Sequence, residues 1–123
     1  MTVNIIVDTR GFLRVSLHGV CNATDRIEVL KQVVHACNAN GIWKIVVDYR
    51  DAEIRACTFD HYQFGKSFNS MGFSERPQIS VITDQQKESS ELLKFSCTVA
   101  WNRGTMIETF NTEREAMDAL SIV

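Results

Sequence analysis

Three residues near the middle of the chain have side chains that could act together in catalysis: Cys57, Asp60 and His61. In cysteine-dependent enzymes an imidazole takes the proton of the thiol, and the thiolate then attacks the substrate. That chemistry also requires an aligned imidazole and an oxyanion hole, which three near neighbours at the start of a helix do not establish. We therefore expect a non-catalytic protein and keep a cysteine-dependent enzyme as the less favoured alternative.

A second set of polar residues follows the predicted strands. Open α/β sheets usually bind ligands at the C-terminal ends of their parallel strands. The residues in that position here, together with the hydroxyl that opens the next helix, are Arg50, Asp51, Thr83, Asp84 and Thr58. They form a predicted ligand or regulatory site for a small polar or anionic molecule. The alternative is that they are solvated loop charges and that Thr58 is an ordinary helix N-cap.

Composition and charge exclude several classes of function. The 13 basic and 15 acidic residues are scattered and give a formal charge of -2, which disfavours binding to nucleic acid. No run of apolar residues is long enough for a membrane span, and the N-terminus does not resemble a signal peptide. The four cysteines contain no Cys-x-x-Cys pair and no partnered histidine, so we expect neither metal nor cofactor. Reduced cysteines are typical of a cytoplasmic protein.

The elements that must position these residues form one α/β domain, 1–123. Alternating apolar residues predict a hairpin with Gly11 in its turn, followed by three more strands. Apolar residues at helical spacing predict four helices, which open near Asn22 or Thr24, at Thr58, after the polar segment 84–90, and at the capping box that begins with Thr112. The order β-β-α-β-α-β-α-β-α favours a mainly parallel five-stranded sheet. The predicted strands are 3–8, 12–18, 44–51, 79–83 and 106–110.

The strands alternate between apolar and polar residues, whereas parallel strands covered on both faces are apolar throughout. We therefore expect helices mostly on one face, the one that collects Val3, Ile5, Val7, Leu13, Val15, Leu17, Ile45, Val47, Tyr49, Ile79 and Val81. The other face is polar apart from four apolar side chains. These are either scattered surface residues or a homodimer face, and they are Ile6, Phe12, Val46 and Ile82.

Several stretches, in this order, carry a resemblance to a known family. They are 25–28, 45–51 with Thr58, 79–84, 95–104, and Phe110 with 112–120. Together they span nearly the whole chain, which resembles the SpoIIAA-like domains grouped with STAS and SEC14-like proteins. The resemblance implies a SpoIIAA-like (STAS-like) β-α superhelix with four helices mostly on one face, in agreement with the alternation of the strands.

The resemblance also implies a function. In sporulation antagonists of this fold, a Ser or Thr at the start of the helix after the central strand is phosphorylated, which switches partner binding. Their motif reads Asp-Ser-Ser-Gly or a close variant, whereas 56–60 here read Ala-Cys-Thr-Phe-Asp, so only Thr58 remains as a hydroxyl. We expect a binding or regulatory domain for a protein partner or small ligand. SEC14-like relatives imply a lipophilic ligand as the alternative.

Overall fold

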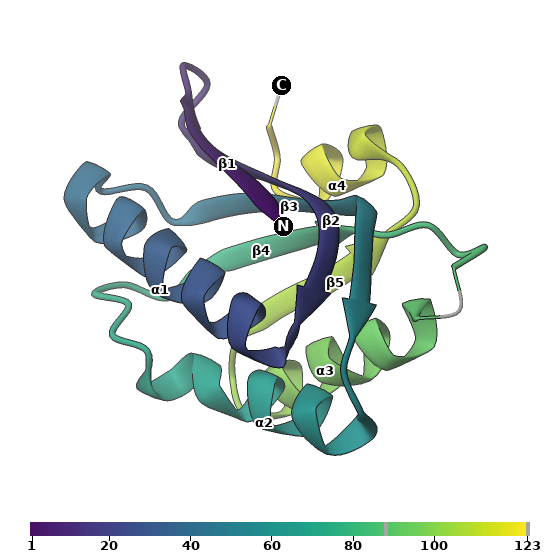
Figure 1. Ribbon diagram of the computed structural model, residues 1–123. Helices are drawn as coiled ribbons and strands as arrows, with labels where there is room; N and C mark the ends of the chain where they lie inside the picture. Colours follow the sequence, from purple (N-terminus) through teal and green to yellow (C-terminus); the bar gives the residue numbers. More distant parts are fainter. Residues whose placement is uncertain (88, 123) are drawn as a thin grey trace.

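The computed structural model describes residues 1–87 and 89–122. Within them lies one five-stranded sheet with spatial order β1-β2-β3-β4-β5. The first two strands form the predicted antiparallel hairpin, and the remaining pairs are parallel. The mainly parallel sheet is therefore confirmed (Figure 1). The strands are β1 (Thr2–Asp8), β2 (Phe12–Asn22), β3 (Lys44–Arg55), β4 (Gln78–Ile82) and β5 (Met106–Phe110).

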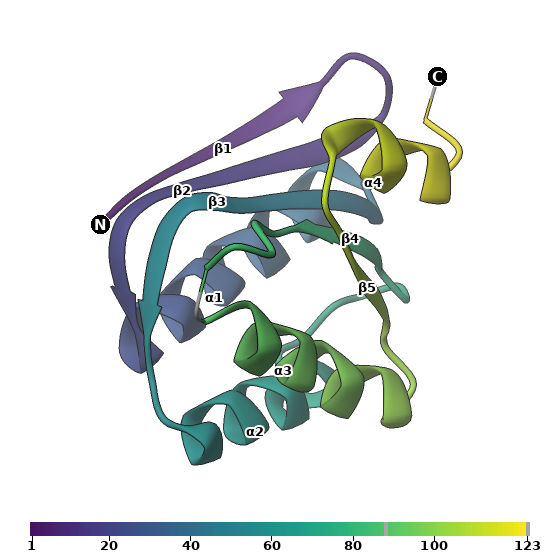
Figure 2. The ribbon, with the colours of Figure 1, turned by 90° about the vertical axis from the view of Figure 1, so that its right-hand side faces the viewer.

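Of the four helices in the described residues, three cover one face of the sheet and one lies on the other face (Figure 2). The covering helices are α1 (Ala23–Asn40), α2 (Thr58–Ser67) and α3 (Ser90–Asn102), with a short 3-10 turn, η1 (Phe68–Ser70), after α2. The fourth is α4 (Glu113–Ala119). The prediction of four helices mostly on one face is confirmed.

The start of α1 is a reciprocal cap. The Asn22 side chain accepts a hydrogen bond from the Asp25 N–H at 2.9 Å, and the Asp25 carboxylate accepts one from the Asn22 N–H at 3.0 Å. Two backbone donors that the helix itself cannot satisfy are thereby satisfied. Of the two predicted starting residues, Asn22 is therefore the cap.

The main core lies between the sheet and helices α1 to α3. The inward residues of the central strands are buried there as the alternation predicts, among them Leu13, Val15 and Ile45. Val7 was expected on this face but is 47% exposed. It sits near the end of β1, the edge strand, and α1 packs on β2 instead.

The second face of the sheet also has a core, which corrects the predicted dimer face. Phe12, Val46 and Ile82 are each 0% exposed and pack in one cluster with residues of α4 and the segment after it. These are Ala116, Leu120 and Ile122. The expectation that the three strand residues lie exposed on this face is wrong, because α4 covers them. Ile6 alone of the four is exposed, at 55%.

Strand β3 is longer than predicted. It continues to Arg55, past the expected end at Asp51, because β2 also extends and the two strands pair as far as Asn22 and Arg55. Strand β4, by contrast, ends with Ile82 opposite Asp48. The ends of β2 and β3 therefore form a two-stranded ribbon that bends away from the rest of the sheet and leads to α2 (Figure 2).

Candidate functional site

The length of β3 separates the residues of the predicted ligand site. Arg50 and Asp51 lie within the strand and do not follow its end. A strand rises about 3.3 Å per residue, so the four strand residues after Asp51 carry the chain roughly 13 Å further before α2 begins. The structure therefore does not bring Thr58 together with Arg50 and Asp51.

Arg50 and Asp51 each have a partner along the ribbon. The Arg50 guanidinium contacts the Asp48 carboxylate at 2.8 and 3.0 Å. Burial raises the pKa of Asp48, but the hydrogen bonds from Arg50 outweigh it, and the pKa lies below its ordinary value. Asp51 lies 3.6 Å from His18 of the neighbouring strand, with both side chains exposed. The charge of Arg50 is therefore paired with that of Asp48 within the chain.

Thr83 and Asp84 have different surroundings. Thr83 is buried, and its N–H donates to the Phe110 carbonyl at 2.9 Å. Asp84 is half-buried and accepts a hydrogen bond from the Gln86 N–H at 2.9 Å. The loop after Asp84 turns back to β3, where the Lys87 ammonium donates to the carbonyl oxygens of Arg50 and Ala52. This loop thus lies beside Arg50, and the two form one exposed polar region.

The start of α2 places Cys57, and not Thr58, at the N-cap. The Asp60 carboxylate accepts hydrogen bonds from the Cys57 N–H at 3.1 Å and from its thiol at 3.2 Å. The bond from the Cys57 N–H, followed by the thiol, lowers the pKa of Asp60. The His61 ring is fully buried and contacts Arg26, and none of the hydrogen bonds of the described residues joins that ring to Cys57. Cys57 and His61 therefore do not form a thiol–imidazole pair, and the Cys57 thiol contacts Asp60 instead.

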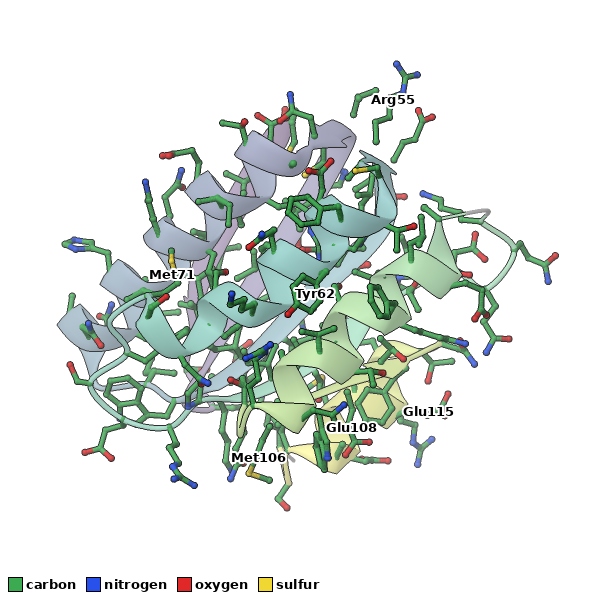
Figure 3. The ribbon with its side chains drawn as sticks, turned by 90° about the horizontal axis from the view of Figure 1, so that it is seen from below. Arg55, Tyr62, Met71, Met106, Glu108 and Glu115 are labelled. Atoms are coloured by element: carbon green, nitrogen blue, oxygen red, sulfur yellow. The ribbon has the colours of Figure 1, made fainter. Side chains whose placement is uncertain are left out.

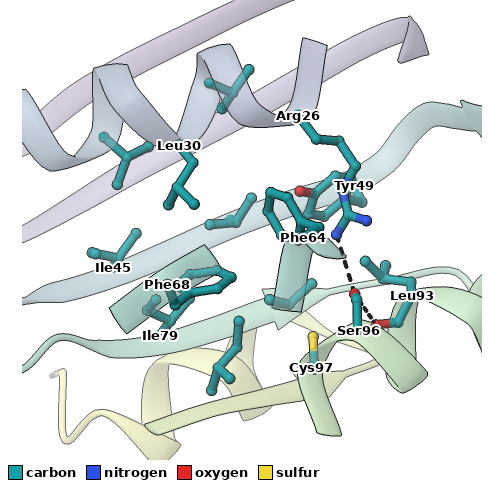
Figure 4. Close-up of a pocket in the computed structure, with 15 residues that line it drawn as sticks. Arg26, Leu30, Ile45, Tyr49, Phe64, Phe68, Ile79, Leu93, Ser96 and Cys97 are labelled. Atoms are coloured by element: carbon teal, nitrogen blue, oxygen red, sulfur yellow. Dashed lines mark hydrogen bonds between the residues drawn. The ribbon is translucent and has the colours of Figure 1, made fainter. Parts of the chain in front are cut away.

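A different polar cluster lies in the main core, centred on Arg26 of α1. This side chain is only 3% exposed. Its Nη1 lies 3.1 Å from His61 Nδ1, and its Nη2 donates to Ser96 Oγ at 3.2 Å. The guanidinium carbon lies 3.7 Å from the centre of the Phe64 ring and 5.7 Å from that of Tyr49 (Figure 4). Three helices and β3 thus converge on one buried cation.

Burial determines the protonation state of His61 in this cluster. The pKa of His61 is lowered to about 4, mainly by burial and secondly by the charge of Arg26. The imidazole is therefore neutral at neutral pH and accepts the Arg26 hydrogen bond at Nδ1, which puts its own proton on Nε2. Neither His61 Nε2 nor Arg26 Nε has a hydrogen-bond partner among the described residues. The cluster thus holds two buried donors that remain unsatisfied.

The cluster lies at one end of a cavity of about 30 Å³ between the sheet and the three covering helices (Figure 4). That volume has room for roughly two water molecules. Apart from Arg26, Ser96 and the Tyr49 hydroxyl, the lining is apolar and includes Leu30, Phe68 and the Cys97 thiol. Burial raises the pKa of Cys97 to about 11, so this thiol is protonated and behaves as an apolar group.

Our sequence reasoning missed Arg26 as a functional candidate, although the sequence contains a signal for it. Arg26 shares a helical stripe with Val29, Leu30, Val33 and Cys37, all of which are buried. A charged residue in an apolar stripe is unusual because burying a charge is costly. The predicted start of α1 within residues 22–24 places position 26 on that stripe.

Comparison with known proteins gives a fold. No protein-family model matches the sequence, and no curated protein matches it. An anti-sigma factor antagonist from Mycobacterium paratuberculosis superposes with a TM-score of 0.62 at 16% identity, over 98% of this chain and 93% of that one. The anti-sigma factor antagonist SpoIIAA in its unphosphorylated form superposes with a TM-score of 0.56 at 10% identity, over 99% and 100%. The chain has a SpoIIAA-like fold.

A third structure supports the same SpoIIAA-like fold. It is an uncharacterized protein of the DUF3478 family from Shewanella loihica PV-4, with a TM-score of 0.57 and 18% identity over 97% of this chain and 92% of that one. In the part of the SpoIIAA-like domain that the structure describes, no helix has the length and apolar character to cross a membrane. The same residues contain no group of three or more side chains suited to hold a metal ion.

Proposed function

We propose that this SpoIIAA-like chain is a non-catalytic regulatory domain that binds a protein partner through the start of α2. The observation that carries the proposal is the exposure of Phe59, which at 63% is the highest among the exposed large apolar side chains of the described residues. Aromatic side chains are enriched at protein interfaces and often dominate their binding energy. The similar structures named as anti-sigma factor antagonists support a protein as the partner.

The residues around Phe59 fit an interface with an apolar centre and a polar rim. Thr58 and Cys57 are exposed beside it. Arg55 projects from the end of β3 (Figure 3) and forms an ion pair with Glu53 at 3.3 Å. An exposed charge pair of this kind contributes little stability to the fold, so it is free to meet a partner's charges. We call this surface, Arg55 with Cys57, Thr58 and Phe59, the α2-start surface.

Thr58 is the residue of this surface that a kinase would modify. It is the first residue of α2, where unpaired N–H groups and the helix dipole favour a phosphate. The Asp60 carboxylate, ionised at neutral pH, stands two residues away and opposes a second negative charge. A phosphate on Thr58 would therefore change the charge of the α2-start surface and weaken binding to a partner that contacts Phe59.

The experiment first identifies the partner and then measures its affinity. A photoreactive phenylalanine analogue at position 59 crosslinks the partner in cells, and binding of the purified partner is then measured by calorimetry. We expect Phe59→Ala to weaken binding at least about tenfold, as for a central interface residue. Ile6→Ala is the matched control, because Ile6 is similarly exposed but lies on the edge strand β1. Equal affinities for wild type and Phe59→Ala would contradict the proposed surface.

Three other expectations stay proposals. A small polar ligand at Arg50, Asp51, Thr83 and Asp84 has less support than a protein partner, because Arg50 is paired with Asp48 and Thr83 is buried. A homodimer has less support than a monomer, because it would have to use contacts other than the three residues that α4 covers. The cytoplasm remains the proposed location, supported by four cysteines that are all unpaired.

A further inference from the structure

We propose that Arg26 binds the carboxylate of a small monocarboxylic acid, whose alkyl chain enters the apolar cavity between the sheet and helices α1 to α3. This site is separate from the α2-start surface, and it does not depend on the proposed protein partner. The inference rests on the burial of Arg26, on its unsatisfied Nε donor and on the lining of the cavity.

The first argument concerns charge. A guanidinium remains charged in proteins, and a buried charge is normally paired with an opposite one. The ion pairs of the described residues include none to Arg26. The Phe64 and Tyr49 rings and two neutral acceptors compensate part of the charge. A bound anion would supply the negative charge that these contacts do not.

The second argument concerns hydrogen bonds. Both unsatisfied groups of the cluster, Arg26 Nε and His61 Nε2, are donors once His61 Nδ1 accepts from Arg26. Of these two donors, Arg26 Nε belongs to a residue that lines the cavity, so it requires a ligand group that accepts, and a carboxylate only accepts. Carboxylates also match the planar fork of a guanidinium with two parallel hydrogen bonds. A hydroxyl or an amine would satisfy the donors less well and would leave the charge in place.

The third argument concerns the rest of the ligand. The cavity beyond the guanidinium is lined by aliphatic and aromatic side chains of β3, β4 and the three helices, among them Leu30, Ile45, Phe68 and Ile79 (Figure 4). An inorganic anion would leave this surface uncovered, whereas an alkyl chain would fill it. The volume of about 30 Å³, room for roughly two water molecules, admits only the shortest acids as the structure stands, and a longer chain would have to displace α2 from the sheet.

A second hollow beside the cavity offers a route for the ligand. It has a volume of about 80 Å³ and is lined by residues of the α1 and α2 starts, including Ala23, Asp60 and Gln63. Arg26 and Phe64 line both this hollow and the core cavity. A rotation of these two side chains would join the two spaces. The Asp60 carboxylate, which lines the second hollow, is already engaged by Cys57.

The experiment measures thermal unfolding of the full chain at neutral pH and constant ionic strength. The probes are the sodium salts of straight-chain carboxylic acids from acetate to octanoate, the 1-alkanols of the same lengths, chloride and phosphate. We expect a saturable rise in Tm with at least one short carboxylate, because a ligand that binds only the folded state stabilises it. The alkanols, chloride and phosphate should produce no comparable rise.

Two variants assign the effect to the cluster. Arg26→Met keeps a side chain of similar length without the charge, and we expect it to weaken carboxylate binding at least tenfold. Arg103→Met is the matched control, because Arg103 also contacts an aromatic ring, Tyr62, but on the surface. If Arg26→Met does not fold, the NMR signal of the Arg26 Nε–H in wild type serves instead, and it should shift as the carboxylate is added.

Each contrary result overturns the inference. In the Tm experiment, such a result is no rise with any carboxylate, or an equal rise with the alkanol of the same length or with phosphate. In the variants, it is a carboxylate affinity of Arg26→Met equal to that of wild type. In the NMR experiment, it is an Arg26 Nε–H signal that does not shift when the carboxylate is added. Loss of partner binding in Phe59→Ala, measured separately, bears only on the α2-start surface. The two proposals therefore fail or succeed independently.

Discussion

At the scale of single residues, the contact between Arg26 and His61 links the charge of α1 to the first turns of α2. The imidazole satisfies one guanidinium donor only while it is neutral, because protonation at Nδ1 would remove the acceptor and place two positive charges 3.1 Å apart. The local structure therefore depends on the protonation state of one buried histidine. This dependence gives a pH effect with a definite sign.

We expect stability to fall as acid protonates His61. Its pKa is lowered from 6.5 to about 4 in the folded chain, so the folded state disfavours the proton that the unfolded chain binds readily. The contribution of neutral His61 to the free energy of unfolding is complete above about pH 6.5 and is lost progressively as the pH falls toward 4. Its size is on the order of 3 kcal/mol. The measurement is urea unfolding of wild type and His61→Gln across this range.

The variant isolates the histidine from the acidic groups that both proteins share. The Gln side chain can still accept from Arg26 but does not titrate in this range. The free energy of unfolding of wild type should therefore drop more than that of His61→Gln between neutral pH and pH 4. If the free energy of unfolding falls equally with pH in the two proteins, His61 does not take up a proton when the chain unfolds.

At the scale of elements, helices α2 and α3 lie side by side beneath the sheet (Figures 1 and 3). Their approach is close at Gly65, where an added Cβ would lie 2.3 Å from the Ser96 carbonyl oxygen and 2.8 Å from Val99 Cβ. Only a residue without a side chain permits that distance. The contact sets the spacing of the two helices and so positions Ser96 and His61 around Arg26.

We expect Gly65→Ala to destabilise the fold by about 2 to 4 kcal/mol, because the clash involves backbone and outweighs the gain of roughly 1 kcal/mol in helix propensity. Chemical denaturation of the variant checks this. Lys66→Ala, the exposed neighbour on the same helix, is the control and should change stability by less than about 0.5 kcal/mol. A Gly65→Ala protein as stable as wild type would mean that the helices can separate at little cost.

At the scale of the whole molecule, α4 decides what the second face of the sheet can do. It closes a small core over Phe12, Val46 and Ile82, and the Ser80 hydroxyl donates to the Ala116 carbonyl at 2.8 Å beneath it. The start of α4 is held by an ion pair between Arg14 of β2 and Glu113. The face that looked available to a second copy is therefore occupied by the chain itself.

This arrangement predicts a monomer. Sedimentation velocity over a range of protein concentrations should give one species at the chain mass of 14.0 kDa. A mass that rises with concentration would restore the homodimer and direct attention to the exposed β1 edge. Ile6→Lys should then dissociate it, because a charge in an apolar contact carries a desolvation cost.

Much of the architecture could be read from periodicity. Alternation at a spacing of two residues identified the hairpin and the inward residues of the central strands. Apolar spacing with Asn22, Thr58 and Thr112 located the helix starts, to within one residue at Cys57. These signals are local, because a strand or an amphipathic helix shows its buried face within a few residues. The resemblance to SpoIIAA-like domains rests on particular stretches of sequence, among them 45–51 and 95–104, and the solved structures confirm it as a fold.

The local pattern alone did not determine which apolar residues meet across the sheet or which polar residues share a site. Helical spacing predicts Ala116, Ala119 and Leu120 as the buried side of the last helix. Ala116 and Leu120 are buried and Ala119 is exposed, and only the tertiary structure places the two buried residues over Phe12 and Val46. The end of β3 at Arg55 depends on its pairing with β2, which is a contact between distant segments.

The candidate site shows the same division. The sequence by itself predicted one α/β domain that resembles the SpoIIAA-like domains, with Thr58 at the start of the second helix. Only the tertiary structure decided that His61 turns inward, away from Cys57, to meet Arg26 and Ser96 from two other helices. The reason is physical: the energy of a buried charge depends on neighbours far apart in the chain, and no spacing rule within one segment encodes them.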